Sequence, residues 1–208
     1  MKEEQDYIQD IAEMRSMMER SSRFLSLSGF AGIMAGIYAL AGAFIVYKVF
    51  HFNPDQLAYD SQPEGLLPAG LLPVIFVALG VLVLAIGTAV ILSSKKAHKR
   101  REKFWNSTTK RLVYHMAVPL VAGGLLVLIL LAKGFIGLIA PCTLLFYGLA
   151  LYNASKFTYE EVKSLGLINI VLGLTGCYFV QYGLLCWAIG FGLVHIIYGI
   201  YMHYRYER

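Results

Sequence analysis

Long apolar runs without a charged residue alternate along this chain with shorter segments that carry its Lys, Arg, Asp and Glu. A helix needs about 20 apolar residues to cross a hydrocarbon core of roughly 30 Å. The pattern predicts an all-α membrane protein, a bundle of six transmembrane helices in one domain over 25–204. The predicted spans are 25–47, 70–92, 113–132, 135–152, 165–182 and 184–202.

The second, fourth and sixth spans share a short pattern near one end, in which Gly87, Gly148 and Gly199 occupy matching places. Some membrane proteins repeat one helical unit about an axis normal to the membrane. Three repeated helical hairpins are therefore one interpretation. Chance similarity among apolar helices is the other, because short glycine-centred matches are common in such sequences.

Composition agrees with this pattern and narrows the function. Of 208 residues, 58% are hydrophobic and 15% are charged, whereas soluble domains are about a quarter charged. All thirteen acidic residues lie outside the predicted spans. An ionised carboxylate in hydrocarbon is costly and typically marks an ion or proton path. The absence of such residues argues against proton- or sodium-coupled transport.

Basic residues predict how the chain is threaded. Short loops rich in Lys and Arg stay in the cytoplasm. With the N-terminus inside, sixteen of the eighteen Lys and Arg fall on the inner side, and only Lys48 and Lys133 fall outside. Both termini are then cytoplasmic. The basic segment 93–111 becomes a cytoplasmic loop beside anionic lipid, and no nucleic-acid partner is expected, because basic clusters of this length are unspecific.

Residues 1–24 are polar and do not open with the basic, then apolar, pattern of a cleavable signal peptide. Tyr7, Ile11, Met14 and Met18 fall on one helical face. This predicts a cytoplasmic amphipathic helix. It lies either against the basic loop, through its acidic residues, or at the membrane interface.

The stretch MRSMMERSSRFLSLSGFAGIMAGIYAL, residues 14–40, resembles uncharacterised small multi-spanning bacterial inner-membrane proteins. The shared feature is a lead-in with Met and Arg, followed by a first span rich in Ser and Gly. The resemblance implies a bacterial plasma membrane and an uncleaved N-terminus. It implies no activity, cofactor or site residue.

Ser28, Gly32 and Gly36 recur every four residues in the first span. Inside lipid, water exclusion does not press helices together, and close contact comes from small residues. We expect this face to pack against another helix. The neighbour is either in the same chain or in a second copy, which would make the chain a homo-oligomer.

A candidate ligand pocket lies in the last span, where Gly192, His195, Gly199 and His203 share one helical face. Small residues around a histidine form either a groove for a ligand or a tight helix contact with one internal hydrogen bond. Asn169, on the preceding span, can also face the bundle interior. An intramembrane polar group is a functional hypothesis by default.

No cofactor is expected, with haem or quinone as the alternative. Haem held by two histidines needs them at matched depth on different helices. His115 and His203 are both near the inner face, and His195 lies about 12 Å deeper than His203. No metal-site spacing occurs among the cysteines and histidines.

Three cysteines, Cys142, Cys177 and Cys186, lie in apolar stretches. Free cysteine is commonly a small buried apolar residue. Cys177 and Cys186 flank a predicted outer turn, so a disulfide between them is a further interpretation.

The sequence contains no nucleophile–base pair, phosphate-binding glycine loop or paired carboxylates of the usual enzyme classes. We therefore expect a non-enzymatic integral membrane protein that binds a small molecule, a lipid or a partner protein, as a sensor or accessory. The alternative is a transporter or redox carrier for a hydrophobic substrate, quinone or haem.

Overall fold

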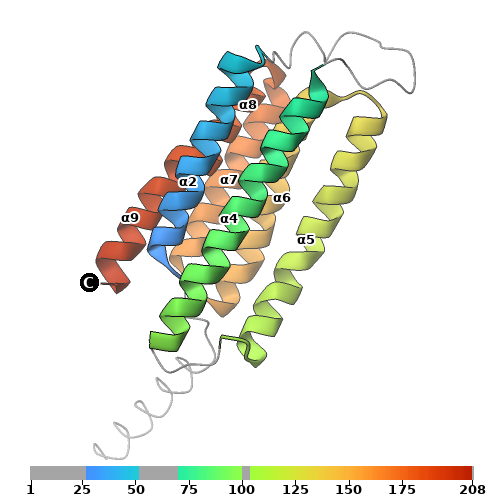
Figure 1. Cartoon of the computed structure of the whole chain (residues 1–208). Helices are drawn as coiled ribbons and strands as arrows, with labels where there is room; N and C mark the ends of the chain where they lie inside the picture. Colours follow the sequence, from blue (N-terminus) through green and yellow to red (C-terminus); the bar gives the residue numbers. More distant parts are fainter. Residues whose placement is uncertain (1–26, 52–69, 100–103, 208) are drawn as a thin grey trace, which may run out of the picture.

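In the computed structural model, the chain is a set of helical rods lying roughly side by side (Figure 1). The structure describes residues 27–51, 70–99 and 104–207. The predicted amphipathic helix 1–24 lies outside the described residues. Within them there is no β-strand. The predicted all-α class is therefore confirmed for the described part of the chain.

Several rods are built from consecutive α, 3-10 and π segments with no break between them. In chain order, the segments are α2 (Gly29–Phe44), η1 (Ile45–Val49), α4 (Leu71–Lys99), α5 (Ser107–Ala132), η2 (Ile136–Leu138), α6 (Ile139–Ala154), η3 (Ser155–Phe157), α7 (Glu161–Tyr178), η4 (Val180–Tyr182), α8 (Gly183–Trp187), η5 (Ala188–Val194) and α9 (His195–Tyr206).

Among the described residues, five helical stretches are long and apolar enough to cross a membrane. These stretches are Gly29–Val49, Leu71–Lys99, Ser107–Ala132, Ile136–Phe157 and Val180–Tyr206. α7 is not among them, and its 18 residues include Glu161, Lys163 and Asn169. The long apolar helices are those of a membrane protein.

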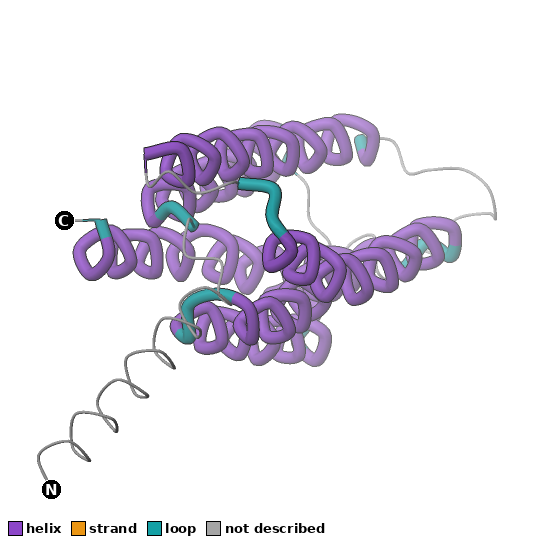
Figure 2. The backbone as a smooth tube through the Cα atoms, turned by 90° about the horizontal axis from the view of Figure 1, so that it is seen from below, coloured by secondary structure: helices purple, strands orange, loops and turns teal. Residues whose placement is uncertain are grey.

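The last rod, from η4 to α9, runs to the C-terminus marked in Figure 2 and contacts α2 as well as α6 and α7. α6 and α7 pack on each other along their length, and α8 packs on both. η5 contacts α7 and α2, and α9 contacts α2. α4 packs on α2, and α5 packs on α6. α4 and α5 are therefore peripheral helices around a core of α2, α6, α7 and the last rod.

α2 and the last rod (η5 and α9) bring their backbones together. A Cβ atom on Gly29 would lie 2.6 Å from the carbonyl oxygen of Gly199, and one on Gly36 would lie 2.6 Å from that of Gly192. Any side chain at these positions would push the helices apart. The α6–α7 pair is built in the same way, with small residues in backbone contact.

The small-residue face predicted in the first span is covered within the same chain. Gly32 and Gly36 pack on the last rod, with a Cβ on Gly32 only 3.3 Å from Cα of Gly199. Ser28 lies at the N-cap of α2 in an extended conformation and is half-buried. The homo-oligomer expected through this face stays a prediction, and the contact with α9 already accounts for the small residues.

The apolar stretches of the two peripheral helices contain almost no fully buried residues. In the most apolar stretch of α4 no residue is buried, and in that of α5 only 6% are, against 33 to 44% in the other three candidate spans. α4 is also longer than its predicted span and continues to Lys99. Much of the basic segment 93–111 is thus helical, as the end of α4 and the start of α5.

Candidate functional site

His195 is buried at the start of α9, and both of its ring nitrogens are hydrogen-bonded. Nδ1 lies 2.7 Å from the carbonyl oxygen of Gly190, and Nε2 lies 3.0 Å from the hydroxyl of Tyr147 on α6. A carbonyl can only accept, so Nδ1 carries the hydrogen. In the neutral ring, Nε2 then accepts from the Tyr147 hydroxyl.

The π-helical segment η5 makes the first of these bonds available. The backbone N–H of His195 bonds to the oxygen of Gly192, and its ring reaches back to Gly190. A side chain at Gly190 would displace Leu144 or Asn169, because a Cβ there would lie 2.5 Å from Cδ2 of Leu144 and 2.8 Å from Oδ1 of Asn169. Single π turns inside helices frequently occur at functional sites.

Asn169 reaches the same place from α7. Its side chain is completely buried, and Nδ2 donates to the carbonyl oxygen of Leu165 at 2.8 Å. Oδ1 has no hydrogen-bond partner among the described residues and lies beside Gly190. The structure thus brings Asn169 and His195 together around Gly190, two of the residues named for the pocket.

Tyr198, three residues after His195 on α9, adds a second unpartnered polar atom. Its hydroxyl is buried and has no hydrogen-bond partner among the described residues. The ring packs on the buried cluster that contains Val162 and Leu165. We call Tyr147, Asn169, His195 and Tyr198 the interior polar cluster.

An unmade hydrogen bond inside a protein is costly, at about 1–3 kcal/mol for each buried group. Two such atoms therefore require an explanation. Water or a ligand that completes the bonds is the usual one. Asn169 Oδ1 needs a donor, whereas the Tyr198 hydroxyl can donate or accept.

The other residues named for the pocket lie elsewhere. Gly192 packs against Leu40 of α2, and Gly199 packs against the backbone of Gly29 and Ile33, so both serve the α2 contact. His115 is exposed on α5 and stacks on Phe157 with ring centroids 4.8 Å apart.

His203 belongs to a separate network around Glu207. Oε1 of Glu207 lies 2.8 Å from Nζ of Lys96 and accepts from the backbone N–H of Gly29 at 2.9 Å. Oε2 lies 2.7 Å from Nδ1 of His203. Lys96 also donates to the carbonyl oxygen of Leu27 at 2.5 Å. Glu207 thereby joins α4, α9 and the start of α2, where a helix leaves N–H groups unpaired.

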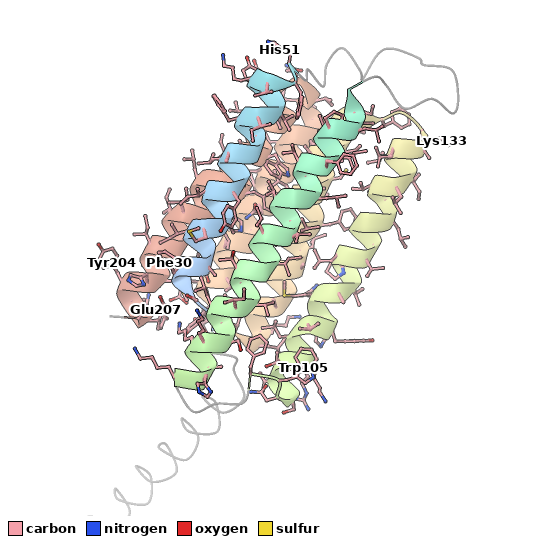
Figure 3. All side chains as sticks on the ribbon, in the orientation of Figure 1. Phe30, His51, Trp105, Lys133, Tyr204 and Glu207 are labelled. Atoms are coloured by element: carbon pink, nitrogen blue, oxygen red, sulfur yellow. The ribbon has the colours of Figure 1, made fainter. Side chains whose placement is uncertain are left out.

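Burial by itself would raise the pKa of the Glu207 carboxyl. The hydrogen bonds from Lys96, His203 and the Gly29 amide outweigh that effect and lower its pKa to about 2. Figure 3 places Glu207 at the same end of the bundle as Trp105, and His51 and Lys133 at the opposite end. We call these the Glu207 end and the Lys133 end.

Sequence reasoning missed the Glu207 network and the Tyr147–His195 bond. Lys96 and Glu207 are 111 residues apart, and periodicity within a helix does not identify its neighbour. Within the described part of the chain, no group of three or more His, Cys, Asp or Glu could hold a metal ion. Both nitrogens of His195 are already used, and the alternative of haem or quinone stays a prediction.

Comparison with protein-family models, with curated proteins and with solved structures finds no match. No relative therefore supplies an activity or a set of site residues for this chain.

Proposed function

We propose that the chain is a non-enzymatic integral membrane protein that binds a small amphipathic molecule at the interior polar cluster, as a sensor or accessory protein. The observation that carries the proposal is the pair of buried, unpartnered atoms, Asn169 Oδ1 and the Tyr198 hydroxyl. A fitting ligand has a hydrogen-bond donor for Asn169 and a second polar group for Tyr198. Its apolar part would lie against side chains such as Leu165, which packs on Tyr198.

The chemistry of the cluster favours binding over catalysis. The only titratable groups in it are Tyr147, His195 and Tyr198, and His195 is held by two bonds within the bundle. A general base needs a free lone pair within reach of its substrate. Nε2 of His195 has its lone pair occupied by the Tyr147 hydroxyl.

A substitution that removes a single oxygen atom tests the proposal. Tyr198→Phe removes only the hydroxyl. If a ligand bonds to it, the purified variant should retain at least several-fold less of the small molecule seen in the wild type by native mass spectrometry. Tyr178→Phe is the matched control, because Tyr178 is 81% exposed. Unchanged retention, together with a higher melting temperature for Tyr198→Phe, would mean that the hydroxyl is simply unpaired, and the proposal would fail.

We further propose that α7 also crosses the membrane, which adds a span to the other five and makes six. The membrane is a bacterial plasma membrane, and both termini lie in the cytoplasm. The support is the distribution of exposed cations, since Lys95, Lys99, Lys110 and Arg111 lie on the ends of α4 and α5 at the Glu207 end. α7 has 18 residues, which at 1.5 Å per residue reach about 27 Å. The same cations would attract anionic lipid head groups.

Single cysteines test this threading. In a background whose three native cysteines are alanine, Lys99→Cys and Lys133→Cys introduce one thiol at each end of the bundle. A membrane-impermeant maleimide added to intact cells should label the Lys133 position and spare the Lys99 position. The opposite pattern would invert the proposed orientation, and labelling of both after cell lysis is the control for access.

A further inference from the structure

The packing of α6 on α7 brings two cysteines together at the Lys133 end. A Cβ on Gly173 of α7 would lie 2.7 Å from the backbone nitrogen of Leu145 on α6. Cys142 precedes Leu145 by three residues, and Cys177 follows Gly173 by four. Residues three or four apart share one face of a helix. Because the helices run antiparallel, both thiols lie one turn beyond this contact, on facing sides.

Neighbouring contacts fix the same register. A Cβ on Gly176 would lie 3.1 Å from Cγ of Pro141 and 3.4 Å from Cβ of Cys186. The residues directly before Cys142 and Cys177 are thus in contact. The thiols of Cys142 and Cys177 also interact with each other. All three cysteines of the chain are free.

Exposure distinguishes the two thiols. Cys142 is 8% exposed, Cys186 is 6% exposed, and Cys177 is half-buried. Cys177 is therefore the more accessible of the two thiols. The sequence left open a Cys177–Cys186 disulfide, whereas the thiol that interacts with Cys177 belongs to Cys142.

We propose that Cys142 and Cys177 form a thiol–disulfide exchange site, whose substrate is a disulfide of a small molecule or a protein segment. The Cys177 thiol loses its proton, and the thiolate attacks one sulfur of the substrate disulfide. A new sulfur–sulfur bond forms, the substrate bond breaks, and the other substrate sulfur leaves as a thiolate.

Cys142 completes the reaction. Its thiol loses a proton, and the thiolate attacks Sγ of Cys177, which releases the second substrate sulfur as a thiolate. The two protons given up by the cysteines balance the two thiolates released. The net result is one substrate disulfide reduced to two thiols and one Cys142–Cys177 disulfide formed. This site lies away from the interior polar cluster and does not depend on the ligand proposed there.

Thiol counting on the full chain in membranes tests the proposal, with oxidised glutathione as the probe. After treatment, the sample is quenched with acid and denatured, and free thiols are labelled with a maleimide-polyethylene glycol that retards the band on a gel. The wild type, with three cysteines, should lose two labels and recover both after dithiothreitol. The Cys186→Ala control should lose both of its labels.

Double variants test whether Cys177 attacks the substrate disulfide before Cys142 does. A Cys142→Ala and Cys186→Ala double variant retains only Cys177, which should accumulate a mixed disulfide with glutathione, seen as added mass. A Cys177→Ala and Cys186→Ala double variant should keep its buried Cys142 free under the same treatment. The proposal is overturned if Cys186→Ala keeps both labels, or if peptide mapping of the oxidised wild type finds Cys186 in the bond.

Discussion

α9 and α4 both pack along α2, but they do so by different means. On the α9 side, backbones touch, and a Cβ on Gly199 would lie 2.6 Å from the carbonyl oxygen of Gly29. On the α4 side, the side chain of Val81 fills the space above Gly42. Gly80 and Gly87 of α4 have nothing within 4 Å of a Cβ position.

The difference shows what holds helices together in lipid. Lipid is as apolar as a leucine side chain, so burying more leucine surface gains little, and close packing and hydrogen bonds decide the association. The α2–α9 contact has close packing along its length. α4 meets α2 through side chains, with Val81 at Gly42 and a Tyr38–Thr88 hydrogen bond, and it has the ion pair of Lys96 with Glu207 at its end. We infer that α9 is fixed on α2, whereas α4 is held mainly at the Glu207 end.

A leucine at a contact glycine should have the largest effect. Gly199→Leu would place its side chain in the backbone of α2, and we expect destabilisation of about 3 kcal/mol or more, since overpacking typically costs 1–3 kcal/mol even where side chains can yield. Gly87→Leu is the control and should change stability by less than about 0.5 kcal/mol, as for exposed positions. Unfolding in detergent, followed by circular dichroism, measures both. Equal effects would contradict the proposed difference between the two interfaces.

The second-largest effect should come from acid, which protonates Glu207 and loosens the attachment of α4. Because the pKa of Glu207 is lowered from 4.5 to about 2, its contribution is fully present above the pKa of the unfolded chain. It is lost as the pH falls from near 4.5 to about 2, and solvent screening of this partly exposed carboxylate limits it to about 1–2 kcal/mol.

Glu207→Gln isolates this contribution from those of other carboxyl groups. The stability difference between wild type and variant should be largest at neutral pH and should shrink across the acid range. A difference that does not change with pH would show that the carboxylate charge is not what Lys96 and the Gly29 amide recognise.

Removing the Tyr147–His195 hydrogen bond in the core should lower the free energy of unfolding by a smaller amount. Tyr147→Phe leaves the Nε2 acceptor of His195 buried without its donor, and we expect a loss of about 1 kcal/mol. Tyr114→Phe on α5, where the side chain is 69% exposed, should change nothing measurable. A double-mutant cycle with His195→Phe should recover the coupling, and its absence would mean that the two side chains do not interact.

The hydrogen bond between α2 and α4 should give the smallest effect. The hydroxyls of Tyr38 and Thr88 are 3.4 Å apart, and interhelical bonds in membrane proteins average about 0.6 kcal/mol. Because this bond is long, Thr88→Val should cost about 0.6 kcal/mol or less in the same unfolding assay. A loss as large as that of Gly199→Leu would place α4 within the fixed core.

The apolar runs were enough to predict where the helices are. They were not enough to predict where each helix ends. α4 continues to Lys99, past the predicted end at 92, and the last rod begins at Val180 instead of 184. Hydropathy falls where the hydrocarbon would end, whereas backbone hydrogen bonding continues into the polar region. The packing face of Gly32 and Gly36 was likewise readable, because small residues spaced by four have a known use in lipid.

The pairing between helices was not readable. Tyr147 with His195, Lys96 with Glu207 and Cys142 with Cys177 each join residues from different helices. A helical period tells which residues share a face, but the neighbour of that face depends on how all the rods assemble. Asn169 was an exception, since an amide in an apolar run is expected to turn toward the interior.

The π turn of η5 has a consequence for any change in chain length. It takes in one residue more than an α-helical turn. On either side of this turn, α8 contacts α6 and α7, and α9 contacts α2. Closing this wide turn to an α-helical one removes one residue and keeps the faces on either side, so a single-residue deletion between Ala188 and Val194 should leave His195 and Gly199 aligned. The same deletion between His195 and Gly199 would turn Gly199 away from α2.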